Sequence, residues 1–243
     1  GDKGPYSELN AYDLLVQAET GLCSLTGNED SPGRVGVSVC DIACGINAYA
    51  LILEALIKRE YSGKGSAIKI SLFESLSEWM NVPFLQYINT KKTPKRVGLS
   101  HPSIVPYGCF ITKDKKNILF SIQNEREWVA FSKKIIKIPE NLEKNFKSPS
   151  LRLKNKNQLN EFIIKIFKLI DSNTLIRLFK KHKIAFGLLN TIKEFSSHPQ
   201  LKKAYVKKNN KNFEFIPPVT LDNKKKFKKI SELGEHTLKI IKE

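Results

Sequence analysis

The chain has 243 residues and a formal net charge of +17. That length allows one large domain or two small ones with a hydrophobic core, so a disulfide-stapled miniprotein is excluded. Hydrophobic residues make up 41% and charged residues 27% of the sequence, which excludes wholesale disorder and a fibrous low-complexity chain.

The positive charge belongs to the second half of the chain. Residues 1–120 carry 13 Lys+Arg against 12 Asp+Glu, whereas residues 121–243 carry 28 against 12. Only six of the 41 basic residues are Arg, the residue favoured for bidentate recognition of phosphates and bases. We therefore expect a Lys-rich solvated surface and no nucleic-acid partner.

The cysteine spacing and the length of the apolar runs bear on the cellular location of the protein. Four cysteines at irregular intervals are typical of reduced cytoplasmic thiols rather than of a disulfide framework. The longest apolar stretch, residues 46–57, is interrupted by Asn47 and Glu54 and falls short of the roughly 20 residues that a membrane span needs. We expect a cytoplasmic location and no membrane partner.

The first third of the chain alternates helix and strand patterns. Residues 12–20, 42–58 and 73–87 have helical periodicity, residues 21–34 form a loop, and residues 35–39 and 67–72 are short strand candidates. Two successive strand–helix units predict an α/β fold, the second half of a Rossmann-like open sheet whose first half would precede residue 1. Residues 1–87 are accordingly assigned to the C-terminal half of a large domain.

A second unit follows a linker over residues 88–105. Strands over 107–112 and 118–122 form a hairpin, and helices are predicted over 125–136, 159–170 and 174–182, with a strand over 184–189. We assign residues 106–185 to a smaller α+β domain. Residues 186–243 form a C-terminal segment that returns to the large domain and ends in a helix over 231–242.

Asp41 is the first candidate for chemistry. It lies where a predicted strand ends and a predicted helix begins. In open α/β sheets, ligands bind at the carboxyl ends of the strands. A helix N-terminus would keep its carboxylate ionised and available as a nucleophile or base. The alternative is that Asp41 is an N-cap, and Asp13 could likewise be an ordinary charge in the first turn of its helix.

A metal site is not predicted. Cys40 and Cys44 are four residues apart and could share one helix face, but no further His or Cys stands at a complementary spacing. We interpret both as small core residues.

Several segments resemble the class III (CaiB/BaiF-type) CoA-transferases, a family that includes formyl-CoA, carnitine and mesaconyl-CoA transferases and the related α-methylacyl-CoA racemases. The most extensive is Tyr-Asp-Leu-Leu-Val-Gln-Ala-Glu-Thr-Gly-Leu at residues 12–22. Others occur in family order at residues 4–6, 25–27, 35–37 leading to Asp41, 62–65, 71–74, 78–80, 101–108, 123–128, 198–201 and 233–237.

The resemblance implies an enzyme that moves CoA from an acyl-CoA donor to a small carboxylic or dicarboxylic acid. It implies that Asp41 is the nucleophile and carries a covalent aspartyl-CoA thioester during turnover. CoA thioesters are then substrates, and no permanently bound cofactor is expected. The alternatives are an inactive fragment or assembly subunit of such an enzyme, or a member of the 2-methylacyl-CoA racemase branch.

The resemblance also implies roles for four further residues. Tyr12 and Asp13 match a Tyr–acid pair that lines the active site, Leu72 matches a residue near the CoA, and Asn124 stands near the position of a racemase Glu. Because the racemase His and Glu are both replaced, the transferase branch is favoured.

The resemblance implies a longer chain, because members of that family have an N-terminal half that is absent here, and it implies an interlocked homodimer. The chain begins with Gly1 rather than Met, and we expect it to be the C-terminal part of a longer enzyme that forms such a dimer when complete.

Overall fold

The computed structural model describes residues 3–208, 211–219, 227 and 229–242. The chain divides into two compact units, Gly1–Leu188 and Leu189–Glu243, which are described in turn. The predicted boundaries at residues 87, 105 and 185 remain predictions.

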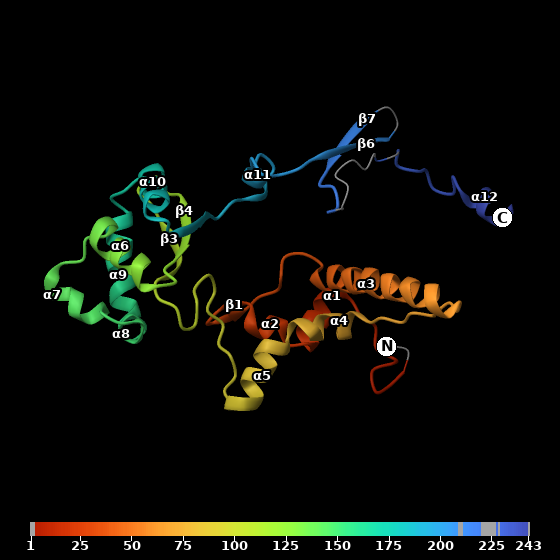
Figure 1. The fold of residues 1–243 in the computed structure, drawn as a ribbon, viewed down its shortest axis with the longest axis horizontal. Coiled ribbons are helices and arrows are strands. Elements are labelled where there is room, and N and C mark those ends of the chain that lie inside the picture. The colour runs from red at the N-terminus through yellow and green to blue at the C-terminus, as the bar shows by residue number, and fades with distance from the viewer. Residues whose placement is uncertain (1–2, 209–210, 220–226, 228, 243) are drawn as a thin grey trace. The chain divides into compact units, whose positions relative to one another are not determined.

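The first part of unit 1 is helical (Figure 1). Ser71 caps α4, because its hydroxyl accepts the backbone N–H of Glu74 at 3.1 Å, and Gly63 ends α3 in the left-handed conformation at φ 68°. A small core joins α1, α3 and α4 through Val16, Val39, Cys40 and Leu76. The elements are α1 (Asp13–Glu19), α2 (Leu22–Leu25), β1 (Gly27–Asn28), β2 (Ser31–Pro32), α3 (Val39–Ser62), α4 (Leu72–Trp79) and α5 (Asn81–Thr90).

The two strands predicted in this region, over residues 35–39 and 67–72, are not observed. Residues 33–38 and 63–71 are neither helix nor strand, and a β-branched run becomes a strand only when a neighbouring strand satisfies its backbone groups. The backbone N–H of Val35 instead donates to the side chain of Gln17 at 2.9 Å. Each sheet among the described residues is antiparallel, so the observed fold is mixed α/β with small sheets.

The helix predicted over 73–87 is two helices, because Met80 departs from helical geometry between α4 and α5. Residues 91–106 contain no regular element, whereas residues 88–90, assigned to the predicted linker, form the end of α5.

The second part of unit 1 packs helices on a three-stranded sheet of order β3-β4-β5 (Figure 1). The predicted hairpin is confirmed, with Cys109 opposite Leu119, and Phe120 pairs with Phe186 on β5. The elements are β3 (Tyr107–Ile111), β4 (Asn117–Ser121), α6 (Glu125–Ala130), a π-helical turn (Phe131–Ile135), α7 (Glu140–Glu143), a 3₁₀ turn (Lys144–Phe146), α8 (Pro149–Lys154), α9 (Lys156–Phe167), α10 (Ser172–His182) and β5 (Ala185–Leu188).

The core of this part is built around Phe120. Its ring centroid lies 5.0–5.5 Å from those of four other phenylalanines, Phe110, Phe131, Phe167 and Phe179. All five side chains are nearly inaccessible, since alternate residues of β3 and β4 face the helices. The predicted α+β architecture is therefore observed for these residues.

Unit 2 contains α11 (Ile192–Phe195), an antiparallel hairpin of β6 (Ala204–Lys208) and β7 (Lys211–Phe215), and α12 (Thr237–Lys242). Thr191 and Glu194 form a reciprocal capping box on α11. The predicted terminal helix starts at Thr237 rather than at residue 231, because Gly234 adopts a positive φ of 78° just before it.

Candidate active site

Asp41 lies in the first turn of α3, and its side chain is exposed. The N-cap of that helix is Ser38, three residues earlier, so the alternative that Asp41 is the N-cap is wrong. Within the described part of the chain, the Asp41 carboxylate accepts no hydrogen bond. A free carboxylate next to the partial positive charge of a helix N-terminus is available for chemistry.

The first turn of α3 is capped from another helix. The side chain of Ser38 forms no capping hydrogen bond, whereas Asp13 Oδ1 accepts the backbone N–H of Cys40 at 2.9 Å. Cys40 Sγ in turn lies 3.3 Å from the backbone oxygen of Asp13, to which the thiol donates. The structure thus brings Asp13, at the start of α1, to the residue next to Asp41.

Two pKa shifts follow from this contact. Burial acts to raise the pKa of Asp13, but hydrogen bonds from the Cys40 backbone and the Gln17 side chain outweigh it and hold the pKa below its ordinary value. Burial, reinforced by the neighbouring Asp13 carboxylate, raises the pKa of the Cys40 thiol to about 12. Cys40 is therefore a buried, neutral thiol, which is a poor nucleophile.

Gln17 is a part of the site that the sequence reasoning missed. Its side chain is completely buried, with Nε2 donating to Asp13 Oδ2 at 2.8 Å and Oε1 accepting the Val35 N–H at 2.9 Å. The available signal was its spacing of four residues from Asp13, which places both on one face of α1.

Tyr12 and Leu72 lie at the starts of α1 and α4, the two helices that share a small core with α3. Tyr12 is the N-cap residue of α1, and its side chain is 71% exposed. Leu72, the first residue of α4, is half-buried against the core cluster that contains Val39 and Cys40. Of the four predicted binding residues, Asp13 contacts the first turn of α3 directly, Tyr12 precedes Asp13 in the chain, and Leu72 packs against the same core cluster.

Asn124 lies in the other part of unit 1. It caps α6, where Oδ1 accepts the Glu127 N–H and Nδ2 donates to Glu127 Oε1, both at 2.9 Å. The described structure shows no hydrogen bond from Asn124 to the residues around Asp41. Arg152 anchors the same corner through its ion pair with Glu125 and its position 4.5 Å from the Trp128 ring.

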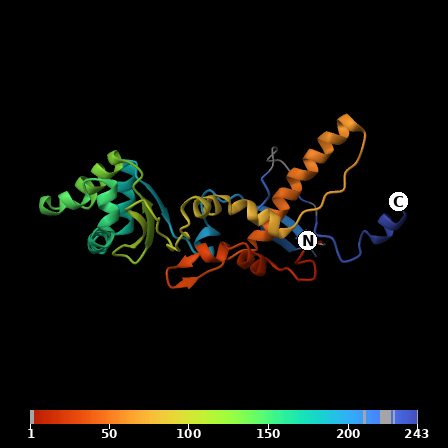
Figure 2. The same cartoon turned by 90° about the horizontal axis from the view of Figure 1, so that it is seen from below.

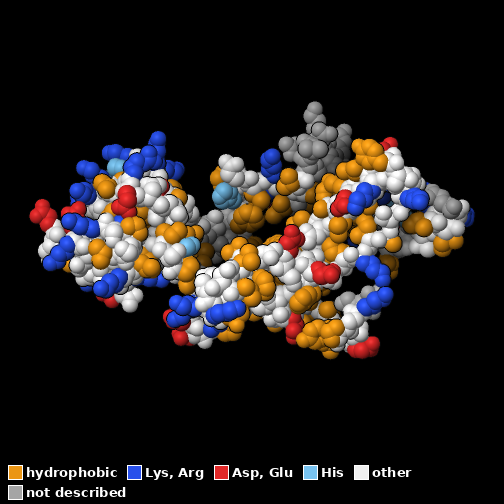
Figure 3. Space-filling view, turned by 60° about the horizontal axis from the view of Figure 1, so that its bottom comes forward, with side chains coloured by type: hydrophobic (Ala, Val, Ile, Leu, Met, Phe, Trp, Pro, Cys, Tyr) orange, Lys and Arg blue, Asp and Glu red, His pale blue; other side chains and the backbone are white. Residues whose placement is uncertain are grey.

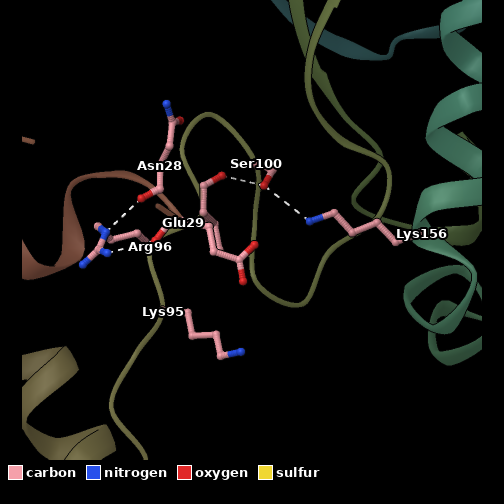
Figure 4. Close-up of a pocket in the computed structure, with 7 residues that line it drawn as sticks. Asn28, Glu29, Lys95, Arg96, Ser100 and Lys156 are labelled. Carbon is pink, nitrogen blue, oxygen red and sulfur yellow. Dashed lines mark hydrogen bonds between the residues drawn. The ribbon is translucent and has the colours of Figure 1, made fainter. Parts of the chain in front are cut away.

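A shallow pocket occurs elsewhere in unit 1 (Figure 4). The guanidinium of Arg96 is used to hold the loop, because it donates to the backbone oxygens of Asn28 and Glu29. The pocket contains none of the predicted site residues and is lined by Asn28, Glu29, Lys95, Arg96, Val97, Ser100 and Lys156. Among the described residues, no group of three or more His, Cys, Asp or Glu could hold a metal ion.

Comparisons with known proteins now define the class. The model of CoA-transferase family III matches residues 1–223, so the chain belongs to that family. It is 32% identical over 203 residues to the human succinyl-CoA:glutarate CoA-transferase, covering 83% of this chain and 46% of that protein. It is 27% identical over 182 residues to the succinyl-CoA:mesaconate CoA-transferase of Haloarcula marismortui, covering 74% of this chain and 45% of that protein.

The fold has a counterpart among solved structures. A CAIB/BAIF family protein from Brucella suis superimposes with a TM-score of 0.85 at 26% identity, covering 100% of this chain and 65% of that one. The family resemblance read from the sequence motifs is confirmed. The chain spans slightly less than half the length of the curated relatives it matches.

Proposed function

We propose that this chain forms part of a CoA-transferase that moves CoA between small dicarboxylic acids through an aspartyl-CoA thioester on Asp41. The observation that carries this proposal is the exposed Asp41 carboxylate in the first turn of α3, fixed beside α1 in a chain of CoA-transferase family III. The dicarboxylate preference is supported by two relatives whose names include glutarate and mesaconate.

The first half of the proposed reaction charges the enzyme. A carboxylate oxygen of Asp41 attacks the thioester carbonyl of the donor, the C–S bond breaks, and CoA leaves as a thiolate. The product is a mixed anhydride between Asp41 and the donor acid. The CoA thiolate then attacks the Asp41 carbonyl of the anhydride, which releases the donor carboxylate and leaves the aspartyl-CoA thioester.

The second half repeats these steps in reverse order with the acceptor. Its carboxylate attacks the aspartyl thioester and expels CoA thiolate, which then attacks the acceptor side of the new anhydride. Asp41 is released as a carboxylate and the acceptor leaves as its CoA thioester. No proton is removed from carbon in any step, so the reaction requires no strong base.

We further propose that the residues around Asp41, together with Asn124, contact the substrates. Tyr12 and Asp13 line the site beside Asp41, and Leu72 supports the CoA from the start of α4. Asn124 faces the acyl-CoA from the β4–α6 corner, where Glu127 and the cap of α6 hold its amide. The Cys40 thiol takes no part, since it is buried and protonated.

The exposed face of α3 supports a larger fold than the described residues show. Apolar side chains spaced three or four residues apart are 42–67% exposed along this helix, namely Ile42, Ile46, Tyr49, Leu53, Leu56 and Ile57. Figure 2 shows the C-terminal part of α3 extending past its neighbours, and Figure 3 shows exposed hydrophobic side chains on this face of the molecule. Such a stripe is typical of a helix covered by another protein layer.

We propose that the covering layer is the part of the family fold that this chain does not span, including a Rossmann-like sheet. The complete protein would then be a cytoplasmic interlocked homodimer, and four free cysteines in the structure are compatible with that location.

Helix α3 also bears on the expectation of no membrane partner. By length and composition alone Val39–Ser62 could cross a membrane, although the sequence reasoning excluded every such segment. The core helix of a soluble protein passes the same test of length and composition, so the absence of a membrane partner stays a prediction. An experiment must therefore decide whether a protein layer or a lipid bilayer covers the exposed face of α3.

The nucleophile is tested in the full-length polypeptide that contains this chain. Succinyl-CoA should form an adduct on Asp41 that hydroxylamine cleaves, and both Asp41→Asn and Asp41→Ala should abolish the adduct and transfer to glutarate. Asp30→Asn, in an exposed turn, is the matched control and should transfer CoA normally. Transfer retained in Asp41→Asn would show that another group is the nucleophile.

The covering layer is tested with Ile46→Glu combined with Leu53→Glu. In the full-length protein these two charges should reduce the soluble dimer measured by light scattering, whereas Ile111→Glu, at an exposed position of β3, should not. Flotation of the unsubstituted protein with phospholipid vesicles would contradict a protein layer and favour a membrane.

A further inference from the structure

The side-chain amide of Gln17 is completely buried in the helical part of unit 1, and both its nitrogen and its oxygen have hydrogen-bond partners. Its Nε2 donates to Asp13 Oδ2 at 2.8 Å and approaches the Val35 backbone oxygen at 3.5 Å, while its Oε1 accepts the Val35 N–H at 2.9 Å. A buried amide is costly unless its groups are satisfied, so these contacts define one orientation for the side chain.

Hydrogen bonds to Gln17 and Asp13 hold the two ends of the segment over residues 35–40. Gln17 holds Val35, and Asp13 holds Cys40 through its backbone N–H. The residues between them lead into α3 and include Ser38, whose side chain forms no capping bond. Two side chains of α1 therefore fix both ends of the segment from which α3 starts.

Asp41 is the next residue after this clamp, which consists of Gln17, Asp13 and the backbone of Val35 and Cys40. The position of its carboxylate depends on where the first turn of α3 begins, since its side chain has no hydrogen bond of its own among the described residues. A displacement of about 1 Å at a reacting group can cost roughly 100-fold in rate.

We propose that Gln17 is a positioning residue for the nucleophile, acting through Asp13 and the segment from Val35 to Cys40. The inference rests on the proposed function of Asp41. It predicts that Gln17 affects the rate at which Asp41 is acylated and not the affinity for the acyl-CoA, because Gln17 is buried and does not reach a substrate.

Two substitutions separate positioning from simple packing. Gln17→Leu retains the volume and removes the hydrogen bonds. Gln17→Glu keeps the shape, and only its protonated form can donate to Asp13 while accepting from Val35. Its titration would be governed by Asp13 on α1, by Cys40 and Asp41 on α3, and by Arg34 in the preceding loop. Activity of this variant relative to the unsubstituted enzyme should therefore rise as the pH falls.

The test uses the full-length polypeptide with succinyl-CoA and measures the Asp41 adduct in single turnovers. We expect Gln17→Leu to lower the acylation rate by roughly 10-fold to 100-fold, with the KM for succinyl-CoA changed much less. Gln17→Glu should recover toward the unsubstituted rate between pH 8 and pH 5.5. Gln86→Leu makes the same chemical change on the exposed side of α5 and is the matched control.

Equal acylation rates in the unsubstituted and Gln17→Leu enzymes would overturn the positioning role while leaving Asp41 as the nucleophile. A loss confined to KM, or a Gln17→Glu defect that does not change with pH, would overturn it as well. Absence of any adduct on Asp41 in the unsubstituted enzyme would overturn the proposed function, and the positioning role with it.

Discussion

Asp13 and Asp41 should contribute very differently to the stability of the first turn of α3. Replacing Asp13 by Ala removes the acceptor of the Cys40 N–H, a capping loss of about 0.5–2 kcal/mol. It also leaves the buried Nε2 of Gln17 without its 2.8 Å partner, at about 1–3 kcal/mol. Together the two losses come to about 1.5–5 kcal/mol. Replacing Asp41 by Ala or Asn removes only an exposed charge near a helix N-terminus, about 0.3–1 kcal/mol.

Hydrogen exchange followed by mass spectrometry of the full-length protein measures this difference locally. Peptides that cover the start of α3 should lose protection in Asp13→Ala, and a gap of about 2 kcal/mol corresponds to roughly 30-fold in the opening equilibrium. Asp41→Ala and Asp41→Asn should stay close to the unsubstituted protein and to one another. Protection lost equally in Asp13→Ala and Asp41→Ala, or lost in Asp41→Ala but kept in Asp41→Asn, would refute the assignment of the cap to Asp13.

Three further outcomes are expected. Phe120→Ala should destabilise the β3–β5 part by about 3–5 kcal/mol in denaturant titration, because it opens a cavity among four aromatic rings, whereas a cost below about 1 kcal/mol would contradict that core. Hydrogen bonds from Ser172 and Thr112 hold the pKa of Asp114 below its usual range, so its stabilising effect should be full above about pH 4 and lost on further acidification. Asp114→Asn should therefore be less stable near neutral pH and converge with the unsubstituted protein in acid; a gap independent of pH would exclude this linkage. Incubation of the full-length enzyme with a 2-methylacyl-CoA in D₂O should give no α-deuterium, since Tyr12 and Asn124 replace the paired bases of the racemase pattern, and rapid uptake with racemisation would place the enzyme in that branch.

Local patterns predicted the longer helices and the β3–β4 hairpin, but not the short helices α2, α7, α8 and α11. Helical periodicity identified α1, α3, α9 and α10, and the alternation of apolar residues identified the paired strands β3 and β4. The family motifs also indicated the class of enzyme, and the family match confirms it. These features depend on residues close together in the chain, where propensity and spacing carry the information.

The arrangement around Asp41 could be inferred only in part. The sequence singled out Asp41, Asp13 and Tyr12, but it assigned Asp13 no partner and left Gln17 unnoticed as one more polar residue on a short helix. The hydrogen bonds from the Val35 N–H to Gln17 and from the Cys40 N–H to Asp13 join residues 18 and 27 positions apart. The spacing of residues along the chain therefore does not predict these contacts.

By itself, the sequence determined where the longer helices lie, that β3 and β4 form a hairpin, and which family the chain belongs to. Only the tertiary structure decided that residues 33–38 and 63–71 are not strands, that Ser38 is the N-cap of α3, and that α1 supplies the cap through Asp13. The physical reason is that strands and remote caps need partners from elsewhere in the chain, whereas a helix satisfies its own backbone and keeps its pattern within a few residues.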